Sequence, residues 1–181
     1  MILNLEPFPE LKTNRLLLRR LTMDDRCELM WMRSDDRVNQ YLEREKSMDI
    51  EEAADFIERI DKSLADGKSV YWVIGFLESP TLIGAICLWN FVTEKDLAEL
   101  GYELSSFYHG KGLMQEAVEK VIQYGFNTLG LKTIIAIPHE ENERSISLLV
   151  RNGFKKDEHY RYANRLETGN HVAYYLLRDK D

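Results

Sequence analysis

Cysteine, long apolar runs and leader-type segments are scarce or missing in this sequence. The two cysteines, Cys27 and Cys87, lie far apart and lack the spacing of a metal site. No segment stays apolar for the about 18 residues that a membrane-spanning helix needs. The N-terminal segment has no basic region followed by an apolar one, as a secretory signal would. We therefore expect reduced thiols, no metal, no membrane contact and a cytoplasmic location.

Basic residues are also in the minority. The chain has 24 Lys and Arg against 31 Asp and Glu, which gives a net charge of −7. Nucleic-acid-binding proteins usually carry a basic patch or stripe, so this balance disfavours a nucleic-acid partner. It is compatible with a cationic substrate such as an amine. With 181 residues, no internal repeat and no Gly/Ser-rich linker, we expect one domain over residues 1–181.

Strand-like and helix-like patterns alternate along the chain. Strands are expected over residues 15–21, 70–77, 82–88, 97–104, 133–138, 154–161 and 171–177. Helices are expected over residues 22–33, 47–67, 112–129 and 142–152. This order predicts an α+β or α/β domain with about four helices around one mixed sheet of about seven strands.

The most informative stretch is residues 98–117, in which a strand leads through Gly110-Lys111-Gly112 into a helix. Two glycines at such a junction let the main chain approach a ligand closely. The unpaired N–H groups of the first helical turn then face that ligand, and the helix dipole favours negative charge there. The stretch predicts a phosphate or pyrophosphate site, to which Lys111 adds a point charge.

The same stretch departs from two common nucleotide-binding motifs. A P-loop needs Lys and Ser or Thr after its last glycine, whereas Leu113 and Met114 follow Gly112 here. The dinucleotide fingerprint needs a third small residue, and Gln115 stands at that position. On spacing alone, a tight strand-to-helix turn without a ligand is an equal alternative.

Further motifs accompany the loop in a consistent order. They are Ala98-Glu99-Leu100-Gly101-Tyr102 before it, Glu116-Ala117 after it, Asn142-x-x-Ser145 at the start of the last helix, and Gly153-Phe154 at its end. With these motifs the sequence resembles the GNAT superfamily of N-acetyltransferases over about residues 12–178. Within it, the sequence is most similar to the Rim-like branch, whose members acetylate the N-termini of ribosomal proteins.

The resemblance implies an α+β fold of the α/β/α sandwich type, with a mostly antiparallel sheet in which two central parallel strands splay apart in a V. It also implies acetyl-coenzyme A as cosubstrate, bound at that splay. Those strands would end near Leu104 and Pro138, with the pantetheine arm added along the first one. The pyrophosphate would lie on the amides from His109 to Met114, and Asn142 would touch the pantetheine or hold its own loop. The implied cofactor-binding residues are Leu100, Tyr102, Leu104, His109, Gly110, Lys111, Gly112, Leu113, Met114 and Asn142.

Two positions depart from the superfamily pattern. Many members have Arg or Gln three residues before the first loop glycine, where this chain has Phe107. Many also have a tyrosine acid four residues before Gly-Phe, where this chain has Leu149. As in other Rim-like sequences, Ser145 is then the candidate acid for the departing thiolate. Its structural alternative is a first-turn residue that caps the helix or faces solvent.

Direct acyl transfer also needs a base for the attacking amine. Glu99 is the first candidate, acting through a water molecule, and Glu103 is the reserve because alternation places it on the same face of the strand. The alternative for Glu99 is a strand carboxylate in a structural ion pair. An α-amine has a pKa of about 8 and a lysine of about 10.4, so a terminal amine needs far less help to lose its proton at pH 7.

We therefore expect transfer to a protein or peptide N-terminus, with a small amine such as a polyamine or an antibiotic-like compound as the alternative. A non-catalytic acyl-coenzyme A binding module is the further alternative, and exposed sheet edges make a homodimer plausible. The acceptor would meet a specificity loop over residues 35–45, whose acidic Asp35, Glu43 and Glu45 either attract a cation or are only solvated. The aromatic residues considered for lining its site are Trp31, Tyr41, Trp72, Trp89, Tyr160, Tyr162 and Tyr174.

Overall fold

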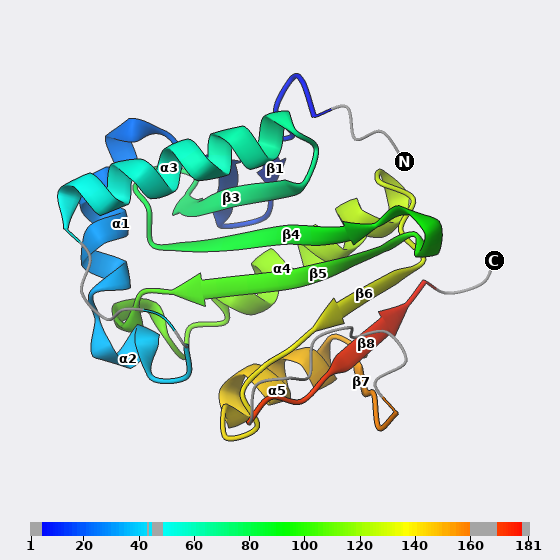
Figure 1. Ribbon diagram of the computed structural model, residues 1–181. Coiled ribbons are helices and arrows are strands. Elements are labelled where there is room, and N and C mark those ends of the chain that lie inside the picture. The colour runs from blue at the N-terminus through cyan, green and yellow to red at the C-terminus, as the bar shows by residue number, and fades with distance from the viewer. Residues whose placement is uncertain (1–4, 43, 45–48, 160–169, 179–181) are drawn as a thin grey trace.

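The computed structural model describes residues 5–42, 44, 49–159 and 170–178. Within them, one sheet of eight strands runs through the molecule in the order β1-β2-β3-β4-β5-β6-β8-β7 (Figure 1). All neighbouring strands are antiparallel except β5 and β6. The strands are β1 (Leu11–Lys12), β2 (Leu16–Arg20), β3 (Ser69–Phe76), β4 (Gly84–Val92), β5 (Leu97–Leu104), β6 (Thr133–Ala136), β7 (Lys155–Lys156) and β8 (Tyr174–Leu177).

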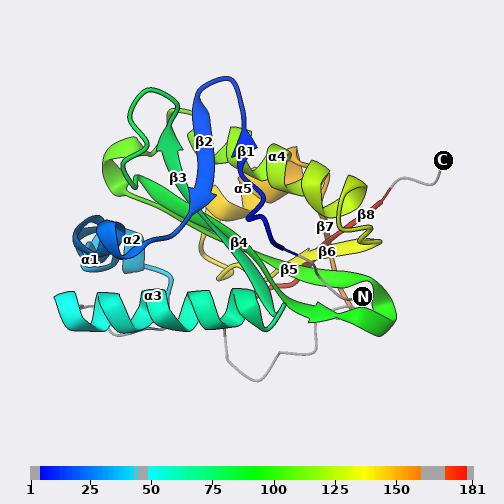
Figure 2. The same ribbon diagram turned by 90° about the horizontal axis from the view of Figure 1, so that it is seen from above.

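Helices cover both faces of the sheet. The helices are α1 (Arg26–Arg33), α2 (Asp36–Asn39), α3 (Ile50–Ala65), α4 (Leu113–Asn127) and α5 (Glu143–Arg151). Figure 2 shows α1, α2 and α3 on one side of the sheet and α4 and α5 on the other. The predicted α+β sandwich with a mixed, mostly antiparallel sheet is confirmed. None of the helices in the described ranges is long and apolar enough to cross a bilayer.

Alternation along the strands builds two cores from one sheet. In β3, Val70, Trp72 and Ile74 belong to the core under α4 and α5, whereas Tyr71 and Val73 belong to the core under α1 and α3. Successive side chains of a strand point to opposite faces, so an almost wholly apolar strand supplies both layers. The sequence of β3 is therefore that of a strand covered on both sides.

The longest of these helices, α3, follows from its own sequence. Asp49 caps its N-terminus by accepting from the Glu51 and Glu52 amides, and the Glu52 carboxylate accepts from the Asp49 amide in return. This reciprocal arrangement satisfies donors that a helix start leaves free. Ala53 and Ile57 then lie buried one turn apart against the sheet. The predicted start at residue 47 lies outside the described residues.

The parallel pair diverges after three residue pairs. Strand β5 pairs with β6 only from Leu97↔Thr133 to Glu99↔Ile135, yet it continues beside β4 as far as Leu104. Figure 1 shows β5 and β6 separating toward their carboxyl ends. In the described part of the chain, the β6-facing edge of β5 thus has no strand partner beyond Glu99. The V-shaped splay predicted from the family resemblance is present between these two strands.

Some elements differ from the sequence-based expectation. Strands β1 and β7 have two residues each and α2 has four, too few for a period of apolar residues to identify them. Strand β4 runs to Val92 instead of residue 88, past an irregularity where Asn90 has a φ of 50°. At the other end, the expected strand over 154–161 is limited to β7, and its last two positions lie outside the described residues.

Candidate active site

The loop between β5 and α4 contains two residues in the left-handed backbone region. After a 3₁₀ turn over Ser106–Tyr108, Gly110 has a φ of +75° and Gly112 a φ of +71°. Residues with a Cβ avoid this region, which explains the choice of glycine at both positions. An added Cβ at Gly110 would meet no atom within 4 Å. The loop therefore presents bare main chain to open space.

The amides of this loop are available to a ligand. The first helical bond of α4 runs from the Glu116 amide to the Gly112 carbonyl at 3.2 Å. Within the described residues, none of the N–H groups from Gly110 to Met114 donates to a protein acceptor. The His109 amide, which was predicted to bind the pyrophosphate as well, donates to the Ser106 carbonyl at 3.3 Å, so that part of the prediction is wrong. Together with the dipole of a 15-residue helix, the amides from Gly110 to Met114 have the arrangement that the predicted anion site requires.

The loop is braced from the other end of the sheet. Glu116, in the first turn of α4, accepts from the Thr13 hydroxyl, from the Arg15 amide at 2.8 Å and from Arg15 Nε at 2.7 Å. Partial burial would raise the pKa of Glu116, but these hydrogen bonds outweigh it and lower the pKa. Arg15 Nη1 also donates to the Lys111 carbonyl at 3.1 Å, which ties the loop directly to the start of β2.

Two predicted cofactor residues have partners within the loop. The Lys111 ammonium donates to the Phe107 carbonyl at 3.0 Å and lies 5.2 Å from the centre of the Tyr108 ring. His109 Nε2 lies 2.9 Å from the Leu104 carbonyl, so this imidazole links the loop to the end of β5. Both contacts shape the loop, and a phosphate contact by either side chain stays a prediction.

A pair of hydroxyl groups lies between β5 and α5. The Tyr102 hydroxyl and Ser145 Oγ are 2.7 Å apart, and the Asn142 side chain accepts from the Ser145 amide at 3.1 Å as the cap of α5. Burial raises the pKa of Tyr102 to about 12, more than the Ser145 hydrogen bond lowers it. Tyr102 therefore keeps its proton at neutral pH. Leu149, which stands at the position of the superfamily's tyrosine acid, is fully buried, and an acid role for Ser145 stays a prediction.

Glu99 is a buried carboxylate at the point where the two strands begin to part. Glu99 is 8% exposed, and Asn90 Nδ2 donates to its Oε2 atom at 3.3 Å. Glu99 stands opposite Trp89 in β4 and opposite Ile135, the last β6 residue in register with β5. Its position at the start of the divergence keeps Glu99 as the first candidate for the base.

Glu103, the reserve base, is held in a different way. Arg33 Nε donates to its Oε1 at 3.1 Å and Arg44 Nη1 to its Oε2 at 2.7 Å, while the Tyr71 hydroxyl donates to Oε1 at 3.3 Å. Burial would raise the pKa of Glu103, but the two guanidinium groups outweigh burial and lower it. A carboxylate stabilised in its charged form by two guanidinium groups is a poor base.

The predicted acceptor-lining aromatics divide into several groups. Trp72 is fully buried and donates from Nε1 to the Pro9 carbonyl at 2.7 Å, so its predicted place in the lining is wrong. Tyr174 packs in the same core, and its part in the lining stays a prediction. Tyr41 lies against the His139 ring with 5.5 Å between centroids. Trp89 packs beside Gly101, whose missing side chain leaves it room. Tyr160 and Tyr162 lie outside the described residues.

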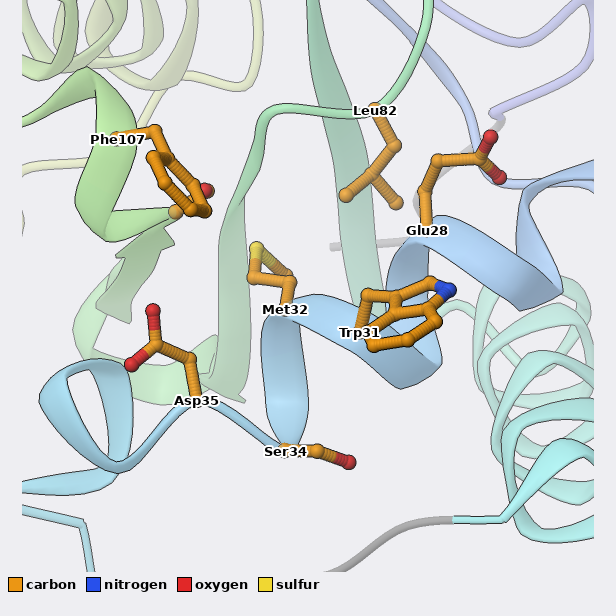
Figure 3. Close-up of a pocket in the computed structure, with 8 residues that line it drawn as sticks. Glu28, Trp31, Met32, Ser34, Asp35, Leu82 and Phe107 are labelled. Atoms are coloured by element: carbon orange, nitrogen blue, oxygen red, sulfur yellow. The ribbon is translucent and has the colours of Figure 1, made fainter.

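The expected specificity loop is in part occupied by its own contacts. Asp35 accepts from Arg37 Nε at 3.2 Å and from the Ser106 hydroxyl at 2.5 Å, and these bonds lower its pKa to about 2. Glu43 and Glu45 lie outside the described residues. A groove of about 410 Å³ opens beside Asp35, and Figure 3 shows Trp31 and Met32 of α1 facing Phe107 across it.

The sequence matches the family model of the "Acetyltransferase (GNAT) domain" over residues 15–155. The chain belongs to the GNAT family of acetyltransferases. It is an acyltransferase, and the predicted family is confirmed. The matched region includes strands β2 to β6, the amide-rich loop and α4, which carry the geometry described above.

Some relatives of this acetyltransferase carry the acceptor in their names, and those acceptors differ. The N-acetyltransferase YoaA of Bacillus subtilis is 33% identical over 160 residues, which is 87% of this chain and 90% of that protein. The ribosomal protein uS5-alanine N-acetyltransferase of Escherichia coli is 41% identical over 58 residues, 32% of this chain and 30% of that one. The structure of a spermidine N-acetyltransferase from Vibrio cholerae, in complex with CoA and spermine, superposes with a TM-score of 0.75 at 21% identity and covers 91% of this chain and 96% of that one.

The acetyltransferase brings most of the predicted residues to one region. Gly110, Gly112, Leu113 and Met114 form the loop and helix start, and Tyr102, Asn142 and Ser145 lie together across the splay. Leu100 and Leu104 bury their side chains in the core, so they offer main chain only. The partners of Glu116 and Glu103 were not predicted; they are Thr13, Arg15, Arg33 and Arg44. A residue far away in the sequence gives no local indication of which side chain it will contact.

Proposed function

We propose that this acetyltransferase moves the acetyl group of acetyl-coenzyme A to the α-amine of a peptide or protein. The observation that carries the proposal is the set of amides from Gly110 to Met114, which lack a protein acceptor at a helix start beside two parting strands. A diphosphate is the anion that such a site fits, since several donors and the helix dipole converge on it.

The rest of the cosubstrate would follow the sheet. Beyond Glu99, the β6-facing edge of β5 has no strand partner in the described part of the chain, so the pantetheine amides have a main-chain edge to bind. Leu100, Tyr102 and Leu104 would contribute main-chain groups, and Asn142 would hold the end of α5 in place. The thioester would then lie between Glu99 and the Tyr102–Ser145 pair.

The acetyl transfer then needs one base and one acid. Glu99 takes a proton from the attacking ammonium, directly or through water, and the free amine attacks the thioester carbonyl carbon. Main-chain N–H groups at the free edge of β5 would stabilise the oxyanion. When the C–S bond breaks, the thiolate takes a proton from the Ser145 hydroxyl, and Tyr102 returns one to Ser145 through their 2.7 Å hydrogen bond. The second proton that the nitrogen loses on becoming an amide passes through water to Tyr102, and Glu99 releases the first proton to solvent. The new amide and free coenzyme A leave.

The α-amine is favoured by its chemistry. Its pKa of about 8 lies close to neutral pH, so a single buried carboxylate such as Glu99 suffices as base, whereas a lysine at about 10.4 demands far more. The similarity to the uS5-alanine N-acetyltransferase supports the same class of acceptor. A polyamine is the competing acceptor, because a spermidine N-acetyltransferase shares the fold.

The test is thiol release from acetyl-coenzyme A with purified protein. The acceptors would be a tetrapeptide amide with a free α-amine, the same peptide with a blocked N-terminus, and spermidine. We expect release with the free peptide and little with the blocked one. Faster release with spermidine would move the proposal to small amines. Coenzyme A binding without release on any acceptor would mark a binding module and overturn the proposal.

A further inference from the structure

A buried charge cluster on β5 has a donor that the protein itself does not use. Glu103 accepts from Arg33, from Arg44 and from the Tyr71 hydroxyl. Arg33 also lies over the Phe56 ring at 3.8 Å from its centre. Two guanidinium groups thus share one carboxylate, and the cluster keeps an excess of positive charge.

The unused donor belongs to Arg44. Its Nη1 atom donates to Glu103 at 2.7 Å and its Nε donates to Asn39 Oδ1 at 2.7 Å, while its Nη2 atom is buried and has no hydrogen-bond partner among the residues that the structure describes. Asn39 is fixed in turn, because its Nδ2 donates to the Arg33 carbonyl at 2.6 Å. A buried polar group without a partner is costly, and in native proteins such a group often marks a site that a ligand completes. The guanidinium is held rigidly with one pair of N–H bonds left free.

The cluster lies on the face from which an amine would approach. Glu103 is in the part of β5 that has no β6 partner among the described residues, where the thioester is expected. Alternation places Glu99 on the same face of the strand as Glu103. Gly101, between them, has no side chain to separate the two carboxylates. Arg44, bonded to Glu103, is therefore close to the path of the acceptor.

We propose that Arg44 Nη2 binds an oxygen atom next to the reacting amine, either the first peptide carbonyl or the carboxylate of a free amino acid. The inference rests on the proposed acetyl transfer and names the acceptor class as α-amino acyl compounds. Arginine suits this role, because its planar fork can bind Glu103 with one edge and an acceptor oxygen with the other. A polyamine offers only cations and no oxygen atom, so it would leave the Nη2 donor without an acceptor.

The test compares Arg44→Lys with the wild-type enzyme. Lysine can keep a charge beside Glu103 but loses the Nη2 donor. The acceptors would be an alanine-starting tetrapeptide amide, free alanine, benzylamine, which has no oxygen, and spermidine. We expect the variant to raise KM for the peptide about tenfold to a hundredfold, the usual effect of losing a charged hydrogen bond. Its kcat would change little, and its KM for benzylamine would match that of the wild type.

Arg59→Lys is the matched control, since Arg59 lies 5.7 Å from the Phe56 ring centre and no hydrogen bond is seen for it among the described contacts. It should leave every KM unchanged, and the coenzyme A affinity should be equal in all three proteins. A stronger effect with free alanine than with the peptide would identify the carboxylate as the bound group.

Equal losses on all four acceptors, no loss at all, or wild-type preference for spermidine would overturn the inference. Absence of wild-type turnover on every amine would instead refute the proposed function, and this inference with it. The two failures therefore give different results.

Discussion

Gly110→Asp tests the anion site with a control that the protein provides. Gly110 and Gly130 have φ values of +75° and +72°, and an added Cβ at either would meet nothing within 4 Å. They flank opposite ends of α4, whose 15 residues span about 22 Å. Any difference between the two aspartate variants therefore reports position and not backbone strain.

The two effects of the substitution have separate magnitudes. The left-handed conformation costs a residue with a Cβ about 1–2 kcal/mol. In a domain of this size, 1 kcal/mol lowers Tm by about 2–4 °C, so each variant should lose about 2–8 °C. A carboxylate about 4 Å from a phosphate adds about 1 kcal/mol of repulsion in water and about 4 kcal/mol near a protein surface. Coenzyme A binding should then weaken about fivefold to several hundredfold in Gly110→Asp alone.

Titration calorimetry with coenzyme A and a thermal melt of each variant would measure both effects. We expect similar Tm losses for the two variants, and a lower affinity only for Gly110→Asp. Unchanged affinity in Gly110→Asp, or an equal loss in Gly130→Asp, would refute the placement of the diphosphate on this loop.

Three further substitutions test the chemistry and the buried cluster. Glu99→Gln should lower kcat at pH 7 more for a lysine side chain than for an α-amine, because the more basic amine depends more on a base; equal losses would remove Glu99 from that role. Ser145→Ala should lower kcat by about 10²-fold, the usual scale of acid catalysis, with the coenzyme A affinity kept; an unchanged kcat would exclude Ser145 as the acid. Glu103→Gln leaves two buried guanidinium groups uncompensated and should cost about 3 kcal/mol, or about 6–12 °C in Tm. Since the folded pKa of Glu103 is lowered, this stabilisation is present above the unfolded pKa of about 4.3 and is lost as pH falls through the folded pKa. The Tm gap between wild type and variant should therefore shrink in acid, and a gap independent of pH would contradict this origin.

The local elements of the fold could be predicted from the sequence because their signals are local. The strand around Val73, the capped helix after Asp49 and the glycines at 110 and 112 each carry a pattern that only a few structures satisfy. Short elements such as α2 could not, because four residues are too few to show a period. Trp72 was mistaken for a binding residue, because a buried indole and an exposed one look identical in sequence.

The candidate site, like the fold, could be predicted from the sequence only in part. The amide-rich loop could be predicted, because two closely spaced glycines between a strand and a helix indicate a backbone that leaves N–H groups unpaired. The partners of Glu103 could not, because Arg33 and Arg44 lie some 60 to 70 positions earlier and meet it only through the sheet. The same holds for the Arg15–Glu116 brace, whose residues are 101 positions apart. Charge pairing between distant residues is decided by tertiary packing, which no local pattern records.

The central claim is that unpaired amides after His109 bind the diphosphate of coenzyme A. An amide NMR spectrum of the ¹⁵N-labelled protein, titrated with coenzyme A, tests it directly. The account predicts large downfield proton shifts for the amides of Gly110 to Met114, with those of Gly130 and its neighbours unmoved. Saturable binding of coenzyme A without a change in the amide chemical shifts of Gly110 to Met114 would contradict this claim.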